Sequence, residues 1–431
     1  MSVFRSGAAS RLALAIALSS GAALVVATPA QAAKKQEQPA PPKANYSKGF
    51  IAVYQPFAAK LQAGGDLTPL KAEIAAVQAA ATTADDKYAA GQTTYSLGAQ
   101  LKDLALQRQG VDAMIDSGST LAAGQHANQL YAAAQLAYQA KDWGAVRARA
   151  EQAVAAGYAE DVNLMLAESY FAQDQNAAGV DLLDKAIAKK VAAGEAVPDT
   201  WLKRGLAMAY NAQLVPQANK FAAMYAQYYP SKDSWGDAVA IQRNLNDYEG
   251  QELLDLLRLA DRTHALRGER DYVDYISASD ARRLPGETQR IIKAGLAAGL
   301  LKSSDVFVSE ANTISAGRVQ ADTADLPKLA KDARAPGATV ATLMAAGDAF
   351  LSYQKPADAE EFYTLALAKP GVDTPRVLTR LGIAQVDQGK TAEAQTTFAK
   401  VEGARQAIAR LWAVYALQAG KPAEATPPPA Q

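Results

Sequence analysis

The sequence predicts an all-α protein in which antiparallel helix pairs stack one on the next. Apolar residues recur at three- and four-residue spacing from Asn128 to Pro230, and small residues recur near the C-terminus at a fixed interval. A helix with such spacing has one apolar face to bury. One helix pair cannot bury its faces alone, but stacking against the next pair can. We therefore expect the fold to be a row of helix hairpins.

The stretch from Asn128 to Pro230 contains the clearest of these hairpins. Each predicted helix is 12 to 15 residues long and ends near a glycine, a proline or a short polar segment. The expected pairs are 128–139 with 143–155, 162–173 with 177–189, and 200–212 with 215–229.

Two regular copies of one pattern lie near the C-terminus. Gly347 and Gly382 are 35 residues apart, as are Ala359 and Ala394. Small residues at such positions let two helices approach closely where they cross, and large residues fill the gaps between crossings. The first copy reads Leu343-x-x-Ala346-Gly347-x-x-Phe350 and then Ala359-x-x-x-Tyr363-x-x-Ala366.

This pattern resembles the tetratricopeptide repeat, which has a period of about 34 residues. The resemblance covers roughly residues 85–230 and 335–403, and a weaker copy begins at Leu166-Ala167. It implies a right-handed α-solenoid of helix hairpins, with an irregular helical segment between its two regular parts. It also implies binding of other proteins.

The chain divides by composition into six expected segments. The middle segment lacks the repeat signature, so it either continues the superhelix as decayed repeats or forms a hinge. In it we expect two short helices, 309–314 and 326–333, joined by loops, and we expect 404–418 to cap the apolar end of the stack. The segments are a signal peptide (1–32), a disordered linker (33–45), an N-terminal array (46–248), the irregular segment (249–336), C-terminal repeats with a capping helix (337–419) and a tail (420–431).

Residues 1–32 have the features of a secretory signal peptide. Arg5 and Arg11 give a positive start, and an apolar run, Leu12–Val26, leads to small residues before Ala32. The run is shorter than the roughly 20 residues that a membrane span needs. We therefore expect cleavage after Ala32, export to the periplasm of a Gram-negative bacterium, and no stable membrane span afterwards. A retained membrane anchor is the alternative.

Composition narrows the classes of function. The 44 basic residues balance the 44 acidic residues, which argues against binding to nucleic acid or to an anionic membrane surface. Cysteine is absent, so disulfides and thiolate catalysis are excluded. Apolar residues make up 49% of the chain, which argues against disorder of the whole.

Motifs for catalysis are scarce. The two histidines, His126 and His264, lie far apart in the sequence, and no HxxxH, GxSxG or GxxxxGK[ST] motif occurs. We therefore predict a protein that is not an enzyme and that has no cofactor and no metal site. Some all-α proteins are glycosidases, which need two converging carboxylates. The close pairs Asp181/Asp184, Asp247/Glu249 and Glu360/Glu361 are expected to lie on solvated helix faces.

The resemblance places a binding groove on the first helix of each pair. Aromatic and amide side chains there suit an extended peptide or a partner helix. Tyr131 and Gln135 replace the Lys, Arg and Asn that hold a C-terminal carboxylate in one subclass, so such a ligand is not expected. Alternatively, Tyr131, Tyr138 and Phe171 simply pack between repeats. On the third repeat, Leu202, Leu206 and Tyr210 are the expected groove positions. The groove residues of the first two repeats, assigned by position, are Asn128, Tyr131, Gln135, Tyr138, Asp161, Leu164, Glu168 and Phe171.

Three functions remain open at this point. The first is a non-catalytic periplasmic protein that mediates protein–protein interaction or scaffolding in the cell envelope. The second is an all-α periplasmic protein that binds or cleaves glycan or peptidoglycan, which would need a deep cleft with two converging carboxylates in the irregular middle. The third is a structural module that associates with itself. The identity of any partner and the oligomeric state cannot be read from the sequence.

Overall fold

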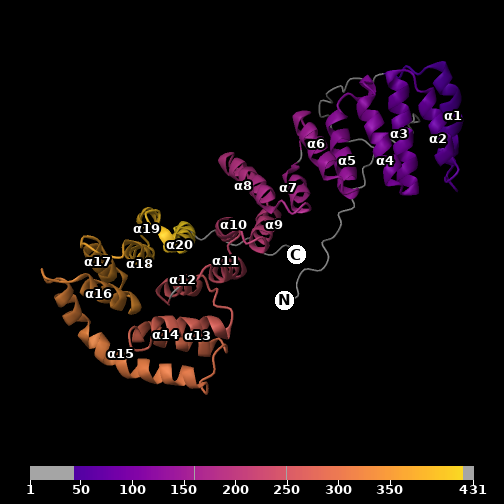
Figure 1. Cartoon of the computed structure of the whole chain (residues 1–431). Coiled ribbons are helices and arrows are strands. Elements are labelled where there is room, and N and C mark those ends of the chain that lie inside the picture. Colours follow the sequence, from indigo (N-terminus) through magenta and orange to yellow (C-terminus); the bar gives the residue numbers. More distant parts are fainter. Residues whose placement is uncertain (1–42, 160, 249, 421–431) are drawn as a thin grey trace, which may run out of the picture. The chain divides into compact units, whose positions relative to one another are not determined.

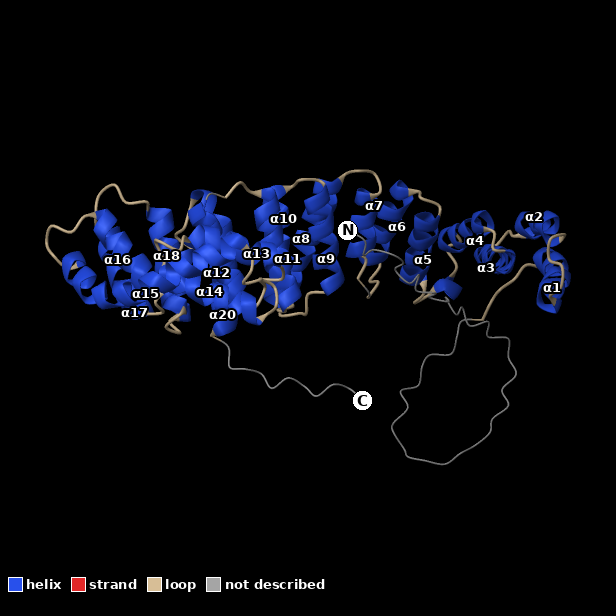
Figure 2. Cartoon of the chain, turned by 90° about the horizontal axis from the view of Figure 1, so that it is seen from below, coloured by secondary structure: helices blue, strands red, loops and turns tan. Residues whose placement is uncertain are grey.

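The structure is a computed structural model that describes residues 43–159, 161–248 and 250–420. Within these ranges the chain forms α-helices and two short 3-10 helices, with no strand, as Figure 2 shows. Helices that follow one another in the chain pack side by side (Figure 1). The prediction of an all-α protein is confirmed. The expected signal peptide, most of the linker and residues 421–431 of the tail lie outside the described residues.

Six of the first ten helices agree closely with the three expected pairs. Nine of the ten begin within two residues of an Asp, Ser, Thr or Pro, which favour helix starts. They are α1 (Lys48–Ala63), α2 (Leu70–Ala80), α3 (Ala84–Leu101), α4 (Leu104–Asp116), α5 (His126–Gln139), α6 (Trp143–Ala155), α7 (Asn163–Phe171), α8 (Asn176–Ala192), α9 (Asp199–Asn211) and α10 (Val215–Tyr228).

The later helices include the segment that lacks the repeat signature. They are α11 (Lys232–Leu245), α12 (Gly250–Arg262), α13 (Glu269–Ser279), α14 (Pro285–Ala297), α15 (Val306–Ala333), α16 (Val340–Ser352), α17 (Pro356–Leu367), α18 (Thr374–Val386), α19 (Thr391–Phe398) and α20 (Gln406–Ala419), with the 3-10 helices η1 (Thr120–Ala122) and η2 (Gly403–Arg405).

One buried carboxylate joins the start of α1 to the start of α3. Asp86 accepts hydrogen bonds from the backbone N–H groups of Ser47, Thr82 and Thr83, at 2.9 to 3.1 Å. Burial raises the pKa of Asp86, but these hydrogen bonds, led by that of Thr83, outweigh burial and lower it well below its usual range. Asp86 therefore stays ionised and fixes the N-terminal helices together.

A glycine on the first helix of a pair contacts an aromatic ring on the second. A Cβ added to Gly205 would lie 2.2 Å from the nearest ring carbon of Phe221. That distance is far inside van der Waals contact, so a larger residue would push α9 and α10 apart. The same contact recurs, 16 residues apart each time, as Gly347–Tyr363 and Gly382–Phe398.

The segment 303–336 differs from its prediction. Two short helices joined by loops were expected, but α15 runs without a break for 28 residues. Its start is capped by Asp305, which accepts from the N–H of Val308 at 3.0 Å. The stretch between the two expected helices has few apolar residues, but it contains three alanines and no proline, so nothing in it prevents a helix from continuing. The apolar pattern therefore missed the continuity of this helix.

Helix α20 contacts helices that lie far away in the sequence. It packs against α18 and α19, and also against α10, α11 and α12. The fully buried Trp412 donates from its indole Nε1 to the backbone oxygen of Asp255 at 2.9 Å. Gln418 donates from Nε2 to the backbone oxygen of Ala226 on α10 at 2.7 Å. The helix expected to cap the end of the stack thus also joins the C-terminal helices to the middle of the chain.

A cluster of buried charges lies where these helices meet. Asp255 on α12 is fully buried and accepts hydrogen bonds from Arg258 (3.0 Å), Arg380 (3.1 Å) and Arg405 (2.5 Å). The three arginines come from α12, α18 and η2, and each is at most 3% exposed. One carboxylate therefore ties three segments of the chain together.

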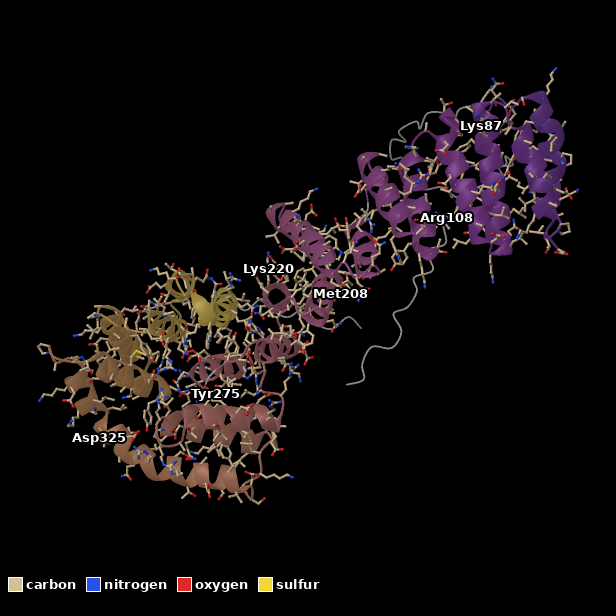
Figure 3. All side chains as sticks on the ribbon, viewed as in Figure 1. Lys87, Arg108, Met208, Lys220, Tyr275 and Asp325 are labelled. Atoms are coloured by element: carbon tan, nitrogen blue, oxygen red, sulfur yellow. The ribbon has the colours of Figure 1, made fainter. Side chains whose placement is uncertain are left out.

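Two further carboxylates complete this buried charge cluster. Asp348 on α16 accepts from Arg380 at 2.7 Å and from the hydroxyl of Tyr363 at 2.9 Å. Glu287 on α14 accepts two hydrogen bonds from Arg258, at 2.8 and 2.6 Å. The hydroxyl of Tyr275, which is labelled in Figure 3 and lies on α13, donates to Glu287 at 2.8 Å.

The arginines keep the buried carboxylates ionised. Burial raises the pKa of Asp348, but the guanidinium of Arg380, followed by that of Arg258, lowers it to about 2. Removing an ion from water costs several kcal/mol. Replacing one partner of such a cluster leaves a buried charge without compensation and therefore destabilises the folded state by about 3–5 kcal/mol. The cluster therefore makes the packing of α12, α14, α16 and α18 strongly interdependent.

No helix among the described residues combines the length and apolar character that crossing a membrane requires.

Candidate functional site

The predicted groove residues of α5 lie at different depths. Asn128 is exposed at the start of the helix, where it donates to Gln125 at 3.3 Å, and Gln135 is half-buried. Tyr131 stacks on Tyr158 with ring centroids 4.3 Å apart, so packing accounts for its ring. Tyr138 is 37% exposed and meets Trp143 edge-on at 5.3 Å. Tyr138 is thus the large accessible side chain of this helix.

The predicted groove residues around α7 divide in the same way. Phe171 is buried against Gly179, and Leu164 packs against the same apolar core. Asp161 precedes the helix, is exposed, and lies 3.6 Å from the Nζ of Lys190. Glu168 is half-buried on the helix face that carries the predicted groove. Phe171 and Leu164 therefore support the surface from below, while Asp161 and Glu168 belong to it.

Arg204, on α9, joins these residues and was not predicted from the sequence. It donates to both carboxylate oxygens of Glu168, and its guanidinium lies 5.3 Å from the ring centre of Phe171. Burial raises the pKa of Tyr138, and the charge of Glu168 raises it further. Glu168 and Arg204 carry opposite charges and are 36 residues apart, which is close to the length of one repeat. From this spacing the sequence could have placed Arg204 beside Glu168.

Tyr210 connects the surface of α9 to α11. Its hydroxyl accepts a hydrogen bond from Nδ2 of Asn244 at 3.4 Å. Asn244 also lines a cavity of about 490 Å³ between α11, α12 and α13. The residues Tyr138, Glu168, Arg204, Tyr210 and Asn244 define what we call the first-helix face, which leads into this cavity.

This first cavity is mostly polar. Its walls carry charged and amide groups from α11, from α13 and from the loops beside them, whereas α12 contributes the apolar Leu253. The lining residues are Gly236, Val239, Ala240, Arg243, Asn244, Asn246, Asp247, Tyr248, Leu253, Ala265, Arg267, Arg270, Asp271 and Asp274.

Arg243 is held in place by two carboxylates. Its Nη1 donates to Asp271 at 2.7 Å, and its Nη2 donates to Asp274. The other oxygen of Asp271 accepts from the backbone N–H groups of Arg267 (2.9 Å) and Gly268 (3.2 Å) and caps α13. Both oxygens of Asp271 are thus already hydrogen-bonded, so it is poorly suited to serve as the protonated acid of a glycosidase.

Tyr248 forms another fixed part of the wall. Its hydroxyl donates to Oε1 of Gln242 at 2.5 Å. Burial, followed by the charge of Glu252, raises the pKa of Tyr248, so the hydroxyl remains protonated. The cavity therefore offers fixed hydrogen-bond donors and acceptors for binding.

A second, smaller cavity adjoins the first. It has a volume of about 310 Å³ and shares Leu253 and Asp274 with its neighbour. Two of its lining residues, Gln251 and Arg283, also contact Asp348 or the arginines of the buried charge cluster.

Three of the six acidic residues noted in the sequence are engaged in separate ion pairs. Asp184 contacts Lys220 at 2.7 Å, and Glu360 contacts Lys390 at 2.6 Å. Glu361 instead meets Arg334 at 2.7 Å. Asp247, expected on a helix face, lies instead in the loop after α11 and lines the first cavity, and Glu249 lies outside the described residues. Within the described ranges, no group of three or more His, Asp or Glu side chains is arranged to hold a metal ion.

No protein-family model matches this chain, and no curated protein matches it significantly.

Proposed function

We propose that this chain is an exported, non-catalytic helical repeat protein of the tetratricopeptide type that binds other proteins in the cell envelope. The partner segment would lie along α5, α7 and α9 and end in the first cavity. One observation carries this proposal: the hydrogen bond between Tyr210 and Asn244 joins the first-helix face to the polar cavity. An extended chain that reaches Tyr210 could therefore continue through Asn244 into the cavity.

The repeated glycine–ring contact supports the repeat assignment. The same contact at the same spacing in α9/α10, α16/α17 and α18/α19 is the packing that the tetratricopeptide pattern implies. The signal peptide, and with it the periplasm of a Gram-negative bacterium, remains a prediction from the sequence. Sequencing the N-terminus of the chain from an envelope fraction tests it: we expect a start at Ala33, and a start at Met1 would contradict export with cleavage.

The chemistry of the face suits peptide binding. Tyr138 offers an exposed ring, and Glu168 with Arg204 offers a carboxylate and a guanidinium. Rings provide contact area, while charged and amide groups pair with the backbone and side chains of a partner. The engagement of Asp271 and Asp274 by Arg243 favours binding over hydrolysis in the first cavity.

Site-specific photo-crosslinking in cells tests this proposal. A photo-reactive residue is placed at Tyr138, at Asn244, or at Val154, which is exposed on the second helix of its pair. We expect the Tyr138 and Asn244 probes to capture the same protein and the Val154 probe to capture none of it. Capture of the same protein at all three positions, or of unrelated proteins at Tyr138 and Asn244, would contradict binding along the first-helix face.

Glycan binding is the second candidate, and the polar first cavity favours it. Asn244, Asn246 and Asp247 offer the amide and carboxylate groups that bind sugar hydroxyls. Co-sedimentation with purified peptidoglycan separates the two candidates, since a protein-binding face predicts no pelleting. Self-association is the third possibility, and sedimentation of the purified chain alone distinguishes it from binding of a different protein.

A further inference from the structure

The second cavity lies between the first turn of α12 and the C-terminal half of α13. It is lined by groups of both charges, by a hydroxyl and by two apolar side chains. A volume of about 310 Å³ lies at the lower end of the range for small-molecule sites. The lining residues are Gly250, Gln251, Leu253, Asp274, Ser277, Ala278, Asp280 and Arg283.

Gln251 occupies a position where an anion would be expected. Its Oε1 accepts hydrogen bonds from three guanidinium groups: Arg380 at 2.7 Å, Arg283 at 2.8 Å and Arg376 at 3.2 Å. A neutral amide oxygen compensates such a concentration of positive charge poorly. Because Oε1 faces the arginines, the Nε2 donor of Gln251 points away from them. Since Gln251 also lines the cavity, this donor is available to a ligand there.

Together with the partly exposed Arg283, Arg376 and Glu252 at its edge, the buried charge cluster behind Gln251 carries one more cation than anions. Nε of Arg376 is buried without a hydrogen-bond partner among the described residues. Burial, followed by the charge of Arg380, lowers the pKa of Arg376, as expected for a cation that lacks full compensation. Glu252 lies 3.3 Å from Arg405. The cations are Arg258, Arg283, Arg376, Arg380 and Arg405, and the anions are Glu252, Asp255, Glu287 and Asp348.

Arg283 lies between the buried charge cluster and the cavity and gives the cavity wall a positive charge. Its hydrogen bonds to Gln251 and Asp348 both use Nη2. The side chain is 38% exposed and lines the cavity, so its remaining N–H groups can reach a ligand there. A planar guanidinium is well matched to a carboxylate.

Asp280 gives the cavity a negative charge. Its carboxylate accepts from the backbone N–H of Arg282 at 2.9 Å, and its backbone oxygen accepts from the N–H of Arg283 at 2.9 Å. Its φ of 56° lies in the left-handed region, which Asp tolerates better than most residues. This turn places Asp280 and Arg283 in the same cavity. The other carboxylate of the lining, Asp274, is already paired with Arg243.

We propose that this cavity binds a free α-amino acid. The carboxylate of the ligand is held by Arg283 and by Nε2 of Gln251, and its ammonium group faces Asp280. Leu253 and Ala278 provide an apolar wall for a side chain. A zwitterion places its carboxylate against the excess positive charge of the cluster and its ammonium group against Asp280. A phosphate dianion would instead meet the carboxylates of Asp274 and Asp280. This site adjoins the first cavity, with which it shares Leu253 and Asp274, but the proposal does not depend on the binding of a partner protein.

Calorimetric titration of the purified full chain tests the site. The probes are each of the protein amino acids, with acetate, methylamine and inorganic phosphate for comparison. We expect at least one amino acid to bind more tightly than all three comparison ligands. Saturable binding of acetate or phosphate as tight as that of any amino acid would overturn the proposal, as would the absence of saturable binding by every amino acid.

Two substitutions and a neighbouring control locate the binding. Arg283→Gln should weaken amino-acid binding roughly ten- to a hundredfold, since it removes a charge-assisted hydrogen bond. Asp280→Asn keeps a residue that tolerates the left-handed turn and should weaken binding by a smaller factor. Arg282→Gln removes an exposed arginine next in the chain and should leave binding unchanged. Equal binding by Arg283→Gln and the original chain would overturn the assignment.

Gln251→Glu separates loss of binding from loss of folding. A carboxylate at this position should compensate the unpaired cation and raise the melting temperature. The same carboxylate should repel the ligand and abolish amino-acid binding. Binding that survives in this variant would contradict the placement of the ligand carboxylate.

Discussion

Helices α5–α10 and helices α11–α20 are held together in different ways. In the first region, the main contacts join helices that follow one another in the chain, and the contacts are largely apolar. In the second, α20 packs on α10, α11 and α12, α12 packs on α18, and a buried charge cluster lies between them. Where contacts are local, loss of one contact weakens mainly the helix pair that makes it. A shared ionic cluster instead couples helices that are distant in the sequence.

The largest expected effect concerns the centre of the buried charge cluster. Asp255→Asn removes the charge that faces Arg258, Arg380 and Arg405, so three buried guanidinium groups lose their shared anion. We expect a loss of about 3–5 kcal/mol in the free energy of unfolding, measured by urea denaturation. Asp181→Asn, at an exposed position on α8, should change it by less than about 0.5 kcal/mol. Similar losses for both variants would remove the distinction between the two regions.

A smaller and local effect is expected from the glycine–ring contact of the first region. Gly205→Ala places a methyl group against the ring of Phe221, and overpacking of this kind costs about 1–3 kcal/mol. Gly144→Ala on α6 serves as the control, since the nearest atom to its Cβ would lie 3.9 Å away. Thermal unfolding of both variants measures the difference. A Gly205→Ala variant as stable as the Gly144→Ala variant would show that α9 and α10 can separate at little cost.

The second region should also lose stability in acid. The pKa of Asp348 falls from 3.8 to about 2 on folding, so its ionised form is preferred in the folded chain. This contribution, about 2 kcal/mol, is fully present above pH 4 or so and is lost as the pH falls through about 2. Urea denaturation along a pH series should show that Asp348→Asn has a weaker acid dependence than the original chain. Identical acid profiles would argue against this role of Asp348.

The smallest effect is expected on the first-helix face. Glu168 and Arg204 are partly exposed, so the ion pair should contribute no more than about 1 kcal/mol. A double-mutant cycle with Glu168→Gln and Arg204→Gln measures that coupling. A coupling above about 3 kcal/mol would place this pair with the buried ions and weaken the comparison of the two regions.

The sequence predicted most helices of the first region. It did not predict that α20, in the second region, packs against α10, α11 and α12. Periodicity identified the pairs α5/α6 to α9/α10 because each helix has an apolar face. It missed the continuity of α15, whose middle has few apolar residues and no proline to end the helix. It also missed the buried charge cluster, because Asp255 and Arg380 are 125 residues apart and charged residues are expected on the surface.

The binding face was partly accessible to the same reasoning. Tyr138 and Glu168 were named by their position in the repeat, and the structure places both beside Arg204. Phe171 was named by the same rule but lies in the core, because Gly179 leaves room for its ring. The two cavities could not be predicted, since each requires helices whose relative placement depends on the three-dimensional packing.

Amide hydrogen exchange in the Asp255→Asn variant tests the contrast between the two regions most directly. If the buried charge cluster holds distant helices together, exchange should accelerate in α12, α18 and α20 together, while α5 and α6 of the first region exchange as in the original chain. Faster exchange in α12 alone would contradict this account. So would an equal acceleration in every helix from α1 to α20.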